Sequence, residues 1–423
     1  MQTRGENIPG SDRVSELLES FVLWLEKYGE TSWDHQSYFA GPVGSRAKAL
    51  YYKNKGLGIM AVAPMVFSEA FFPPVRRMFH HRMRLPIADA HYAMGFAFLY
   101  EATGNARYLE KAVHFLDVLK KTRCPDFNEY CWGYPFDWVT RNGVIRTNTP
   151  LITTTPYVWE AFLQVHQLQP RDGWRQVLES IVRHATTDIK DFKASETANT
   201  CSYTPYDKGG VVNASAYRAF LLTSAAKFFE RNPLLEIAER NLNFVLESQN
   251  EDGSWPYAKD GVRDFVDHFH TCFVMKALAK IHTLTAAPRV LEALKRGVDY
   301  YLQNLFAEDG MPRPFSKAPR LTVYKCELYD CAECINLCLL LRGHFSQLDK
   351  TVQTVTSGIL GNWIKPDGSF RSRKLILGWD NVPMHRWAQS QMFRSIAYYL
   401  LENKGAARQT AKQDNRAELS TIH

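Results

Sequence analysis

Aspartate residues recur at matching places in segments of the sequence that read as loops. Asp137 ends the segment CWGYPFD, and Asp207 ends CSYTPYD, 70 residues later along the chain. Hydrolysis of a bond between two sugars needs two carboxyl groups on opposite sides of that bond, and loops from different repeats could supply them. We predict Asp137 and Asp207 as catalytic residues. The alternative is that each carboxylate caps a helix or bonds to its own loop backbone.

The segment Asp267-His268-Phe269-His270 opens a predicted helix. Asp267 and His270 are three residues apart, so they share one face of that helix at its N-terminus. Histidine exchanges protons near neutral pH, and an epimerase or lyase acting on a uronic acid must remove the proton beside the carboxylate. We predict catalytic roles for Asp267 and His270. The alternative is a capping aspartate and a histidine bonded to a loop carbonyl.

A third acidic candidate is Asp330, which lies between Glu327 and Glu333 at helical spacing where another helix is predicted to start. We predict a catalytic carboxylate role in sugar chemistry for Asp330. Residues 330–333 also resemble, superficially, the acidic motif of oxidosqualene cyclases. Those enzymes are longer, two-domain chains, and a single domain with so many polar loop residues makes a poor carbocation cavity.

The same loops carry aromatic and basic side chains that could hold a substrate. Aromatic rings stack on sugar faces, and guanidinium groups pair with carboxylates and phosphates. The alternatives are that the aromatic residues pack the loops together and that the arginines form a solvated rim. The residues that we predict to bind substrate are Trp132, Tyr134, Arg141, Tyr203, Tyr206, Asn213, Trp255, Tyr257, His268, Arg313, Asp380, Arg386 and Trp387.

Sequence motifs for cofactors and metals are missing. The chain has no phosphate-binding glycine loop and no serine-hydrolase elbow, so we predict no nucleotide cofactor. Cys331 and Cys334 form one C-x-x-C inside an apolar helical pattern, and no second such pair follows. We therefore predict reduced, packed cysteines and no metal, with a zinc site as the alternative.

Composition restricts the class of partner. The 423 residues carry a formal net charge of +7, with lysine and arginine spread along the chain and not gathered in one stripe. A nucleic acid is one possible partner for such a charge, and an acidic oligosaccharide or polysaccharide suits it equally well; we predict the sugar and no nucleic acid. No apolar run reaches the roughly 18 residues that span a bilayer, and the N-terminus resembles no secretory signal. We therefore expect no membrane span and a cytoplasmic location.

A repeat organises the chain. Asp-Gly pairs at 252, 309 and 367 are spaced by 57 and 58 residues, and Pro-aromatic pairs recur in the loops. Between the loops, apolar residues recur at helical spacing in pairs of segments. The predicted pairs are 86–103 with 107–122, 152–167 with 173–190, 211–230 with 233–249, 265–283 with 287–304, and 327–344 with 347–363.

One further pair closes the arrangement. A helix near 385–403 would pair with one near 12–29, giving six helical hairpins, and a helix near 57–70 would be extra. The sequence therefore predicts an all-α (α/α)6 toroid whose six long loops gather at one end. We expect one domain over 13–403, with flexible ends at 1–12 and 404–423. Function should lie where the long loops meet.

Several motifs resemble known families. The segment QNEDGSW at 249–255 is similar to the repeat of α/α-toroid proteins, including terpenoid cyclases. The segments at 130–141, 202–213, 267–271 and 379–387 resemble a toroid family of polysaccharide-biosynthesis proteins from exopolysaccharide and lipopolysaccharide clusters. The resemblance runs from about residue 85 to 402. It implies a fold related to six-hairpin glycosidases, glucuronyl C5-epimerases and toroid polysaccharide lyases.

The sequence thus predicts a cofactor-free enzyme that cleaves or modifies an acidic glycan in surface-glycan biosynthesis, in association with glycan-assembly proteins. Hydrolysis is favoured by the aspartates, and epimerisation or elimination by the histidine and arginines. One alternative is a non-catalytic glycan-binding toroid in a biosynthetic complex. Another is a terpenoid cyclase-like enzyme, which would have a dry, aromatic cavity.

Overall fold

Two concentric rings of helices form the body of the protein. The structure is a computed structural model that describes residues 11–319 and 321–420. In the inner ring each helix contacts the next, and the last contacts the first, so the ring is closed. The inner helices are α5 (Pro86–Thr103), α7 (Thr155–Leu168), α9 (Val212–Phe229), α11 (His268–Thr285), α13 (Leu328–Leu341) and α15 (Ser390–Ser420).

Each inner helix packs against one helix of the outer ring. The outer helices are α1 (Ser11–Tyr28), α6 (Ala106–Lys121), α8 (Asp172–Thr187), α10 (Pro233–Glu247), α12 (Pro288–Asn304) and α14 (Leu348–Asn362). Helix α1 pairs with α15, so the first and last parts of the chain complete the sixth hairpin. This confirms the predicted (α/α)6 toroid.

Inner helices are buried on all sides, whereas outer helices are buried on one side, and the apolar pattern of each helix agrees with this. In α9, only Lys227 and Phe228 are not buried, because neighbours surround this helix on every side. Its outer partner α10 buries Ala238, Asn241 and Val245, at spacings of three and four residues, and exposes the opposite face. A helix with one apolar stripe covers a core, whereas one that is apolar all round must lie inside it.

The two ends of the ring differ in their connections. Partners within a hairpin are joined by short turns, such as the one where Gly104, at φ 73°, ends α5 and the Asn105 side chain caps α6. Residues with positive φ suit such helix ends, and glycine adopts that conformation at no steric cost. The long connections between hairpins lie at the other end.

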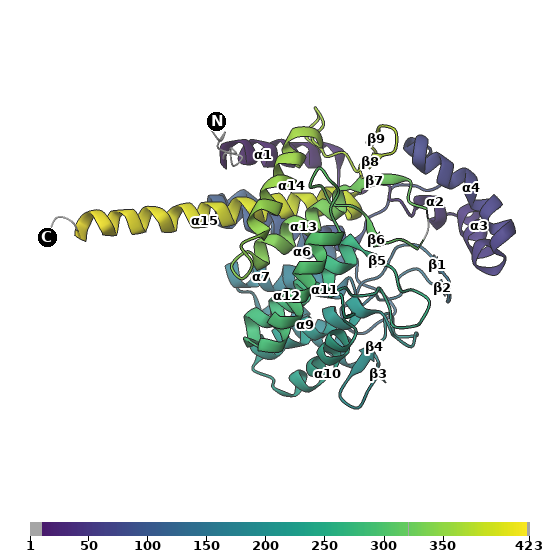
Figure 1. Cartoon of the computed structure of the whole chain (residues 1–423), viewed down its shortest axis with the longest axis horizontal. Helices are drawn as coiled ribbons and strands as arrows, with labels where there is room; N and C mark the ends of the chain where they lie inside the picture. The colour runs from purple at the N-terminus through teal and green to yellow at the C-terminus, as the bar shows by residue number, and fades with distance from the viewer. Residues whose placement is uncertain (1–10, 320, 421–423) are drawn as a thin grey trace.

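Short antiparallel strands tie the long loops together at that end (Figure 1). Three pairs form separate ribbons, and the remaining three strands make one small sheet. The ribbons are β1 (Trp138–Thr140) with β2 (Gly143–Ile145), β3 (Asp191–Lys193) with β4 (Asn199–Cys201), and β5 (Val266–Asp267) with β6 (Phe315–Lys317); the sheet is β7 (Tyr324–Glu327), β8 (Arg373–Leu375) and β9 (Trp379–Asp380).

The three Asp-Gly pairs are turns, as their sequence predicts. Asp252 and Asp367 each accept hydrogen bonds from the backbone N–H and the hydroxyl of a serine two residues later. Asp309 accepts one from the N–H of Met311. The glycines that follow have φ between 74° and 90°, in the left-handed region. These aspartates hold loop geometry in three equivalent repeats.

The first long loop carries a separate helical unit beside the ring. It consists of α2 (Ser37–Ala40), α3 (Pro42–Lys53), α4 (Lys55–Phe71) and η1, a 3-10 helix (Pro73–Met78). A small second core, made of Tyr38, Ala47 and Met65, lies under α3 and α4. The extra helix expected near 57–70 is α4.

Helix α15 extends beyond the ring at the opposite end, where α1 also begins (Figure 1). Residues 1–10 of the expected N-terminal tail lie outside the described residues, and α1 begins at Ser11. The expected C-terminal tail continues α15 as helix to Ser420, and residues 421–423 lie outside the described part. In that part, no helix is both long enough and apolar enough to cross a bilayer.

Candidate active site

The long loops surround one large cavity of about 1020 Å³. Tyr134, Tyr203 and Tyr257 come from three different repeats and all line this space. Inner helices close its floor through Tyr157 of α7 and Tyr217 of α9, whose hydroxyl oxygens are 2.6 Å apart. Segments that are about 60 residues apart in the chain therefore converge on one hollow, as ring closure requires.

His270 and Asp267 form a hydrogen-bonded pair at the wall of the cavity. Asp267 is buried and caps α11, because its Oδ1 accepts the N–H of His270 at 2.9 Å. Its other oxygen, Oδ2, lies 2.6 Å from Nδ1 of the His270 ring. This bond favours the tautomer with the proton on Nδ1, which leaves Nε2 with a lone pair. Nε2 has no partner among the described residues, and the His270 side chain, 22% exposed, lines the cavity.

Aromatic rings hold the His270 imidazole in place. Tyr257 meets it edge-on with ring centroids 4.6 Å apart, and Phe273 does so at 5.5 Å. Tyr257 also stacks on Phe265 at 4.8 Å. The ring therefore has one buried carboxylate partner, fixed neighbours and an open nitrogen, which is the arrangement expected of a general acid or base.

Two residues from opposite ends of the chain, Asp34 and Arg386, form a second charged pair at the cavity. Arg386 donates to both oxygens of Asp34, from Nε at 3.0 Å and from Nη2 at 2.7 Å. Asp34 is fully buried, and the Arg386 guanidinium lies over the rings of Tyr134, at 4.5 Å, and Trp387, at 4.9 Å. Such a forked and stacked arginine is held rigidly. It orients the aromatic wall and presents positive charge to the cavity.

An irregular helix start positions Arg386 and Trp387. Residues His385–Gln389, labelled η2, form a π-helical turn before α15. Turns of this kind are rare and often mark functional sites. Trp387 packs edge-on against His35 at 4.4 Å and against Tyr329 at 4.6 Å, so the turn joins the first loop to α13.

His35 differs from His270 in its environment. Burial and the nearby Arg373 and Arg386 charges lower the pKa of His35 well below its usual value, so its ring stays neutral near neutral pH. Its Nδ1 lies 3.3 Å from Asp34 but makes no hydrogen bond, and its Nε2 lies 2.9 Å from the Gln36 amide nitrogen. His35 lines the cavity as a neutral polar group.

The tyrosines of the wall remain protonated. Burial raises the pKa of Tyr257 to about 12 and raises the pKa of Tyr203 well above its usual value. The pKa of Tyr134 is also raised by burial, against the effect of Arg386. Their hydroxyl groups can therefore donate hydrogen bonds to a ligand at neutral pH.

Positive charge predominates around the cavity. Six lysines and arginines line it, namely Lys48, Arg141, Arg146, Lys208, Arg263 and Arg386, against three aspartates. Arg263 pairs with Asp260 at 2.6 Å. Arg141, at the turn of the β1–β2 ribbon, and Lys208 make no ion pair within the described part of the chain. A bound anion could pair with either of them.

Asp137 and Asp207 make bonds within their own loops. Asp137 accepts the backbone N–H of Thr147 at 2.9 Å and pairs with Arg146 at 2.7 Å. The Thr147 N–H, followed by Arg146, lowers the pKa of Asp137. Asp207 lines the cavity, but it accepts three N–H groups and a hydroxyl of its own loop. This is the loop-bonding alternative stated for both residues, and it leaves neither carboxylate free.

Asp330 and Asp380 lie behind the cavity wall. Both are buried, and neither lines the cavity. Burial, with the Glu327 charge, raises the pKa of Asp330 well above its usual value, and both its oxygens lack hydrogen-bond partners within the described part. Asp380 pairs with the buried Arg76 and accepts the N–H of Val382 at 3.0 Å. These contacts attach the first loop to the sheet β7–β8–β9.

Four other predicted residues also lie away from the cavity. Trp132 and Trp255 are buried, and each indole N–H donates to a carbonyl of the preceding helix, at 2.8 and 3.0 Å. His268 is buried between the Leu305 carbonyl and the Tyr301 hydroxyl. Arg313 donates to the carbonyl of Phe315. The predicted residues that do line the cavity are His270, Asp207, Tyr134, Arg141, Tyr203, Tyr206, Asn213, Tyr257, Arg386 and Trp387.

The structure adds residues that the sequence did not single out. Asp34 and His35 belong to the first loop, where no motif marked them. A fully buried pair, Lys276 of α11 and Glu333 of α13, lies beneath the floor, with the Lys276 ammonium 5.4 Å from the Tyr157 ring centroid. Glu333 lies three residues after Asp330, at the helical spacing noted in the sequence, whereas Lys276, six residues after His270, had no such signal. Within the described residues, no group of three or more potential ligands could hold a metal ion, and the eight cysteines are buried and free.

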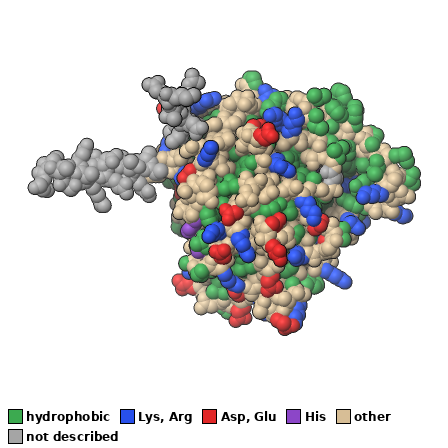
Figure 2. Space-filling view, in the orientation of Figure 1, with side chains coloured by type: hydrophobic (Ala, Val, Ile, Leu, Met, Phe, Trp, Pro, Cys, Tyr) green, Lys and Arg blue, Asp and Glu red, His purple; other side chains and the backbone are tan. Residues whose placement is uncertain are grey.

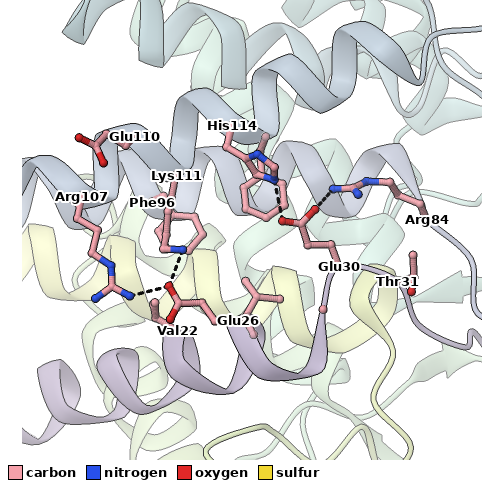
Figure 3. A pocket seen from close by; sticks show the side chains of 13 residues that line it. Val22, Glu26, Glu30, Thr31, Arg84, Phe96, Arg107, Glu110, Lys111 and His114 are labelled. Atoms are coloured by element: carbon pink, nitrogen blue, oxygen red, sulfur yellow. Dashed lines mark hydrogen bonds and ion pairs between the residues drawn. The ribbon is translucent and has the colours of Figure 1, made fainter.

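A second hollow, about 700 Å³, lies on the outer wall between α1 and α6 (Figure 3). Glu26 pairs with Arg107 and Lys111, each at 2.6 Å. The other carboxylate, Glu30, pairs with His114 at 2.7 Å and with Arg84. We call this hollow the α1–α6 groove. Both of its paired glutamates join α1 to the elements on the other side.

Solved structures of similar shape are enzymes that act on carbohydrates. Cellobiose 2-epimerase from Bacillus thermoamylovorans B4167 matches with a TM-score of 0.60 and 9% identity over 76% of this chain and 88% of its own. A glycosyl hydrolase of family 88 from Bacteroides vulgatus matches with a TM-score of 0.58 and 9% identity over 93% and 99%. A polysaccharide lyase matches with a TM-score of 0.57 and 10% identity over 94% and 98%.

At these identities the likeness establishes the fold alone, an (α/α)6 toroid. No family model and no curated protein matches the sequence. Membership of the polysaccharide-biosynthesis family therefore remains a prediction from the motifs.

Proposed function

We propose that this protein is a carbohydrate-modifying enzyme that transfers a proton at a carbon of an acidic sugar, as a uronate epimerase or lyase does. The observation that carries this proposal is the His270–Asp267 pair, whose free Nε2 faces a polar, aromatic cavity. Toroids of this shape include an epimerase, a hydrolase and a lyase that act on carbohydrates, which supports the substrate class.

His270 would act as the general base. Its Nε2 would accept the proton from the carbon beside the sugar carboxylate, while Asp267 stabilises the imidazolium that forms. In epimerisation a proton returns to the opposite face of that carbon. In elimination the neighbouring C–O bond breaks, a double bond forms, and the leaving oxygen takes a proton. Tyr257, protonated and beside His270, is placed to supply it.

Hydrolysis by a carboxylate pair is less well supported. Asp137 and Asp207 are occupied by their own loops, and Asp330 is buried outside the cavity. Two free carboxyl groups facing each other across a sugar bond are the requirement for that reaction. Of the three described aspartates that line the cavity, Asp260 is paired with Arg263 and Asp207 is bonded to its own loop. Only Asp126 makes no hydrogen bond or ion pair among the described residues, so the cavity offers one free aspartate and not two.

The charges of the cavity support the proposal of an acidic substrate. Arg141 and Lys208 offer cations without ion-pair partners among the described residues, and Arg386 adds a fixed guanidinium. Opposite charge draws an anionic ligand into such a cavity. The family-like motifs support a place in surface-glycan biosynthesis. A terpenoid cyclase would instead need a dry cavity, and six basic side chains line this one.

The experiment is incubation with acidic oligosaccharides in heavy water. Deuterium at the carbon beside the carboxylate identifies an epimerase, and an unsaturated uronate, detected by ultraviolet absorbance, identifies a lyase. The variant His270→Ala should abolish the product, whereas His114→Ala, on the exposed outer face, should not. New reducing ends without either signal would overturn the proposal in favour of hydrolysis. Tight binding of the sugar without any product would favour a glycan-binding toroid.

A further inference from the structure

An apolar surface covers the helical unit of the first loop. Helix α4 exposes large hydrophobic side chains that no described part of the chain covers, and Figure 2 shows them gathered at the upper right, where α4 lies. A soluble surface rarely carries so many together, and such patches mark interaction sites. The exposed hydrophobic residues of α3, α4 and their flanks are Val43, Tyr52, Leu57, Ile59, Met60, Val66, Phe67, Phe71, Phe72 and Met78.

The inward contacts of this unit are already made. Gly58, Met65 and Ala70 are the buried residues of α4. Glu69 pairs with Arg373 of β8, which fixes the end of α4 to the sheet. The hydrophobic side chains of α4 that remain exposed therefore form a second face, directed away from the protein.

Charge around this surface is of one sign. Residues 41–81 contain a single acidic side chain, Glu69, and Arg373 neutralises it. Arg46, Lys53 and Lys55 are exposed and make no ion pair within the described part of the chain. An exposed face that combines phenylalanine, leucine and isoleucine with unpaired lysine and arginine is typical of helices that lie in a membrane interface.

We infer that the α3–α4 hairpin docks the protein onto the surface of an anionic lipid bilayer. The apolar side chains of α4 would enter the headgroup region, and the surrounding lysines and arginines would contact lipid phosphates. The protruding position of the hairpin suits a flat surface better than a protein groove (Figure 1). This inference is independent of the proposed function.

The orientation has a consequence for the cavity. Lys48 and Tyr52 of α3 line it, so the hairpin borders its mouth. A docked protein would hold the cavity beside the lipid headgroups. A glycan attached to a membrane lipid could then enter without leaving the surface.

Vesicle flotation of the full chain tests the inference. Vesicles of phosphatidylcholine mixed with phosphatidylglycerol should retain the protein at low salt, and phosphatidylcholine alone should retain it much less. The variant Lys53→Gln/Lys55→Gln should weaken binding about thirtyfold, since each cation near an anionic surface contributes roughly a factor of five. The variant Met60→Ser/Phe67→Ser should weaken it by a similar factor, because two apolar side chains no longer leave water.

Matched controls change equally exposed residues elsewhere. Leu23→Ser, on α1 at 61% exposure, and Lys295→Gln/Lys350→Gln, on α12 and α14, should bind as the unchanged chain does. All variants should keep the thermal midpoint, since the changes lie on the surface. Equal loss in the controls, or no binding to anionic vesicles, would overturn the inference. So would a dimer in sedimentation that Met60→Ser/Phe67→Ser abolishes, because the patch would then be covered by a second copy.

Discussion

The loop-end cavity and the α1–α6 groove are both lined by charged side chains, but their charges are arranged differently. In the groove, Glu26 pairs with Arg107 and Lys111, and Glu30 pairs with Arg84 and His114. In the cavity, His270 Nε2 and the cations of Arg141 and Lys208 have no partners among the described residues. Compensated charge stabilises a helix contact, whereas uncompensated charge is available to a ligand.

The largest expected effect is at His270. Its replacement by alanine should lower kcat/KM by about 10²–10⁴, the usual contribution of a general base, with little change in stability because the ring is partly exposed. Asp267→Asn keeps a capping side chain and should cause a smaller loss, through kcat and not KM. Steady-state kinetics on the substrate found in heavy water measure both. Full activity of His270→Ala would show that His270 is not the general base, and that the unpaired groups of the cavity do not distinguish it as the active site.

The buried Asp34–Arg386 pair should have the next largest effect. Arg386→Met leaves the Asp34 carboxylate buried without its charged partner and with only the Gln36 N–H bonded to it, which costs about 3–5 kcal/mol of unfolding free energy. The double variant Asp34→Leu/Arg386→Met should recover much of that loss, because no buried charge remains. Urea unfolding compares the two. If Arg386→Met were as stable as the unchanged chain, the Asp34–Arg386 pair would not hold the cavity wall in place.

His385 should make stability depend on pH. Its ring bonds to Tyr92 and to the Gly29 carbonyl at the end of α1, and burial lowers the pKa of His385 to about 4. Between pH 6.5 and 4 the unfolded chain binds a proton that the folded chain does not. Stability should therefore fall as pH drops through this window, by about 3 kcal/mol in total.

Thermal midpoints measured across that pH range should fall less steeply for His385→Gln than for the unchanged chain. Above pH 6.5 the difference between the two chains should not change with pH, because the histidine is neutral in both states. Parallel curves would assign the acid sensitivity to other groups.

The smallest effect is expected in the groove. Glu30→Gln weakens the pairs with Arg84 and His114, which are partly exposed, so the unfolding free energy should fall by about 1 kcal/mol or less. Turnover should not change. The loss should shrink in high salt, which screens such pairs. A loss of activity without loss of stability would show that the groove also binds a ligand.

The helical ring was predictable because its signal is long and periodic. The segment 86–103 coincides with α5, and 211–230 extends one residue beyond α9 at each end. Closure of the ring then followed from the count of hairpins. The strands are two to four residues long, too short for an alternating pattern to appear in the sequence.

The site was less predictable, because side-chain direction depends on tertiary packing. Trp132 and Tyr134 are two residues apart in one loop, yet the first is in the core and the second faces the cavity. His268 and His270 differ in the same way: His268 is buried in the core and His270 lines the cavity, since residues two apart on a helix point to different sides. Asp34 carries no local motif, and its partner Arg386 is 352 residues away. Only the closed ring brings them together.

The contact between Asp34 and Arg386 also bears on synthesis of the protein. A ribosome must release the chain beyond position 386 before this side of the cavity can form, although most of the helical hairpins can assemble earlier. Nascent chains that stop short of the last hairpin would present a partly built ring with an open seam. The cavity wall that contains Asp34 and Arg386 would then be completed in a single late step, after the last hairpin has emerged from the ribosome.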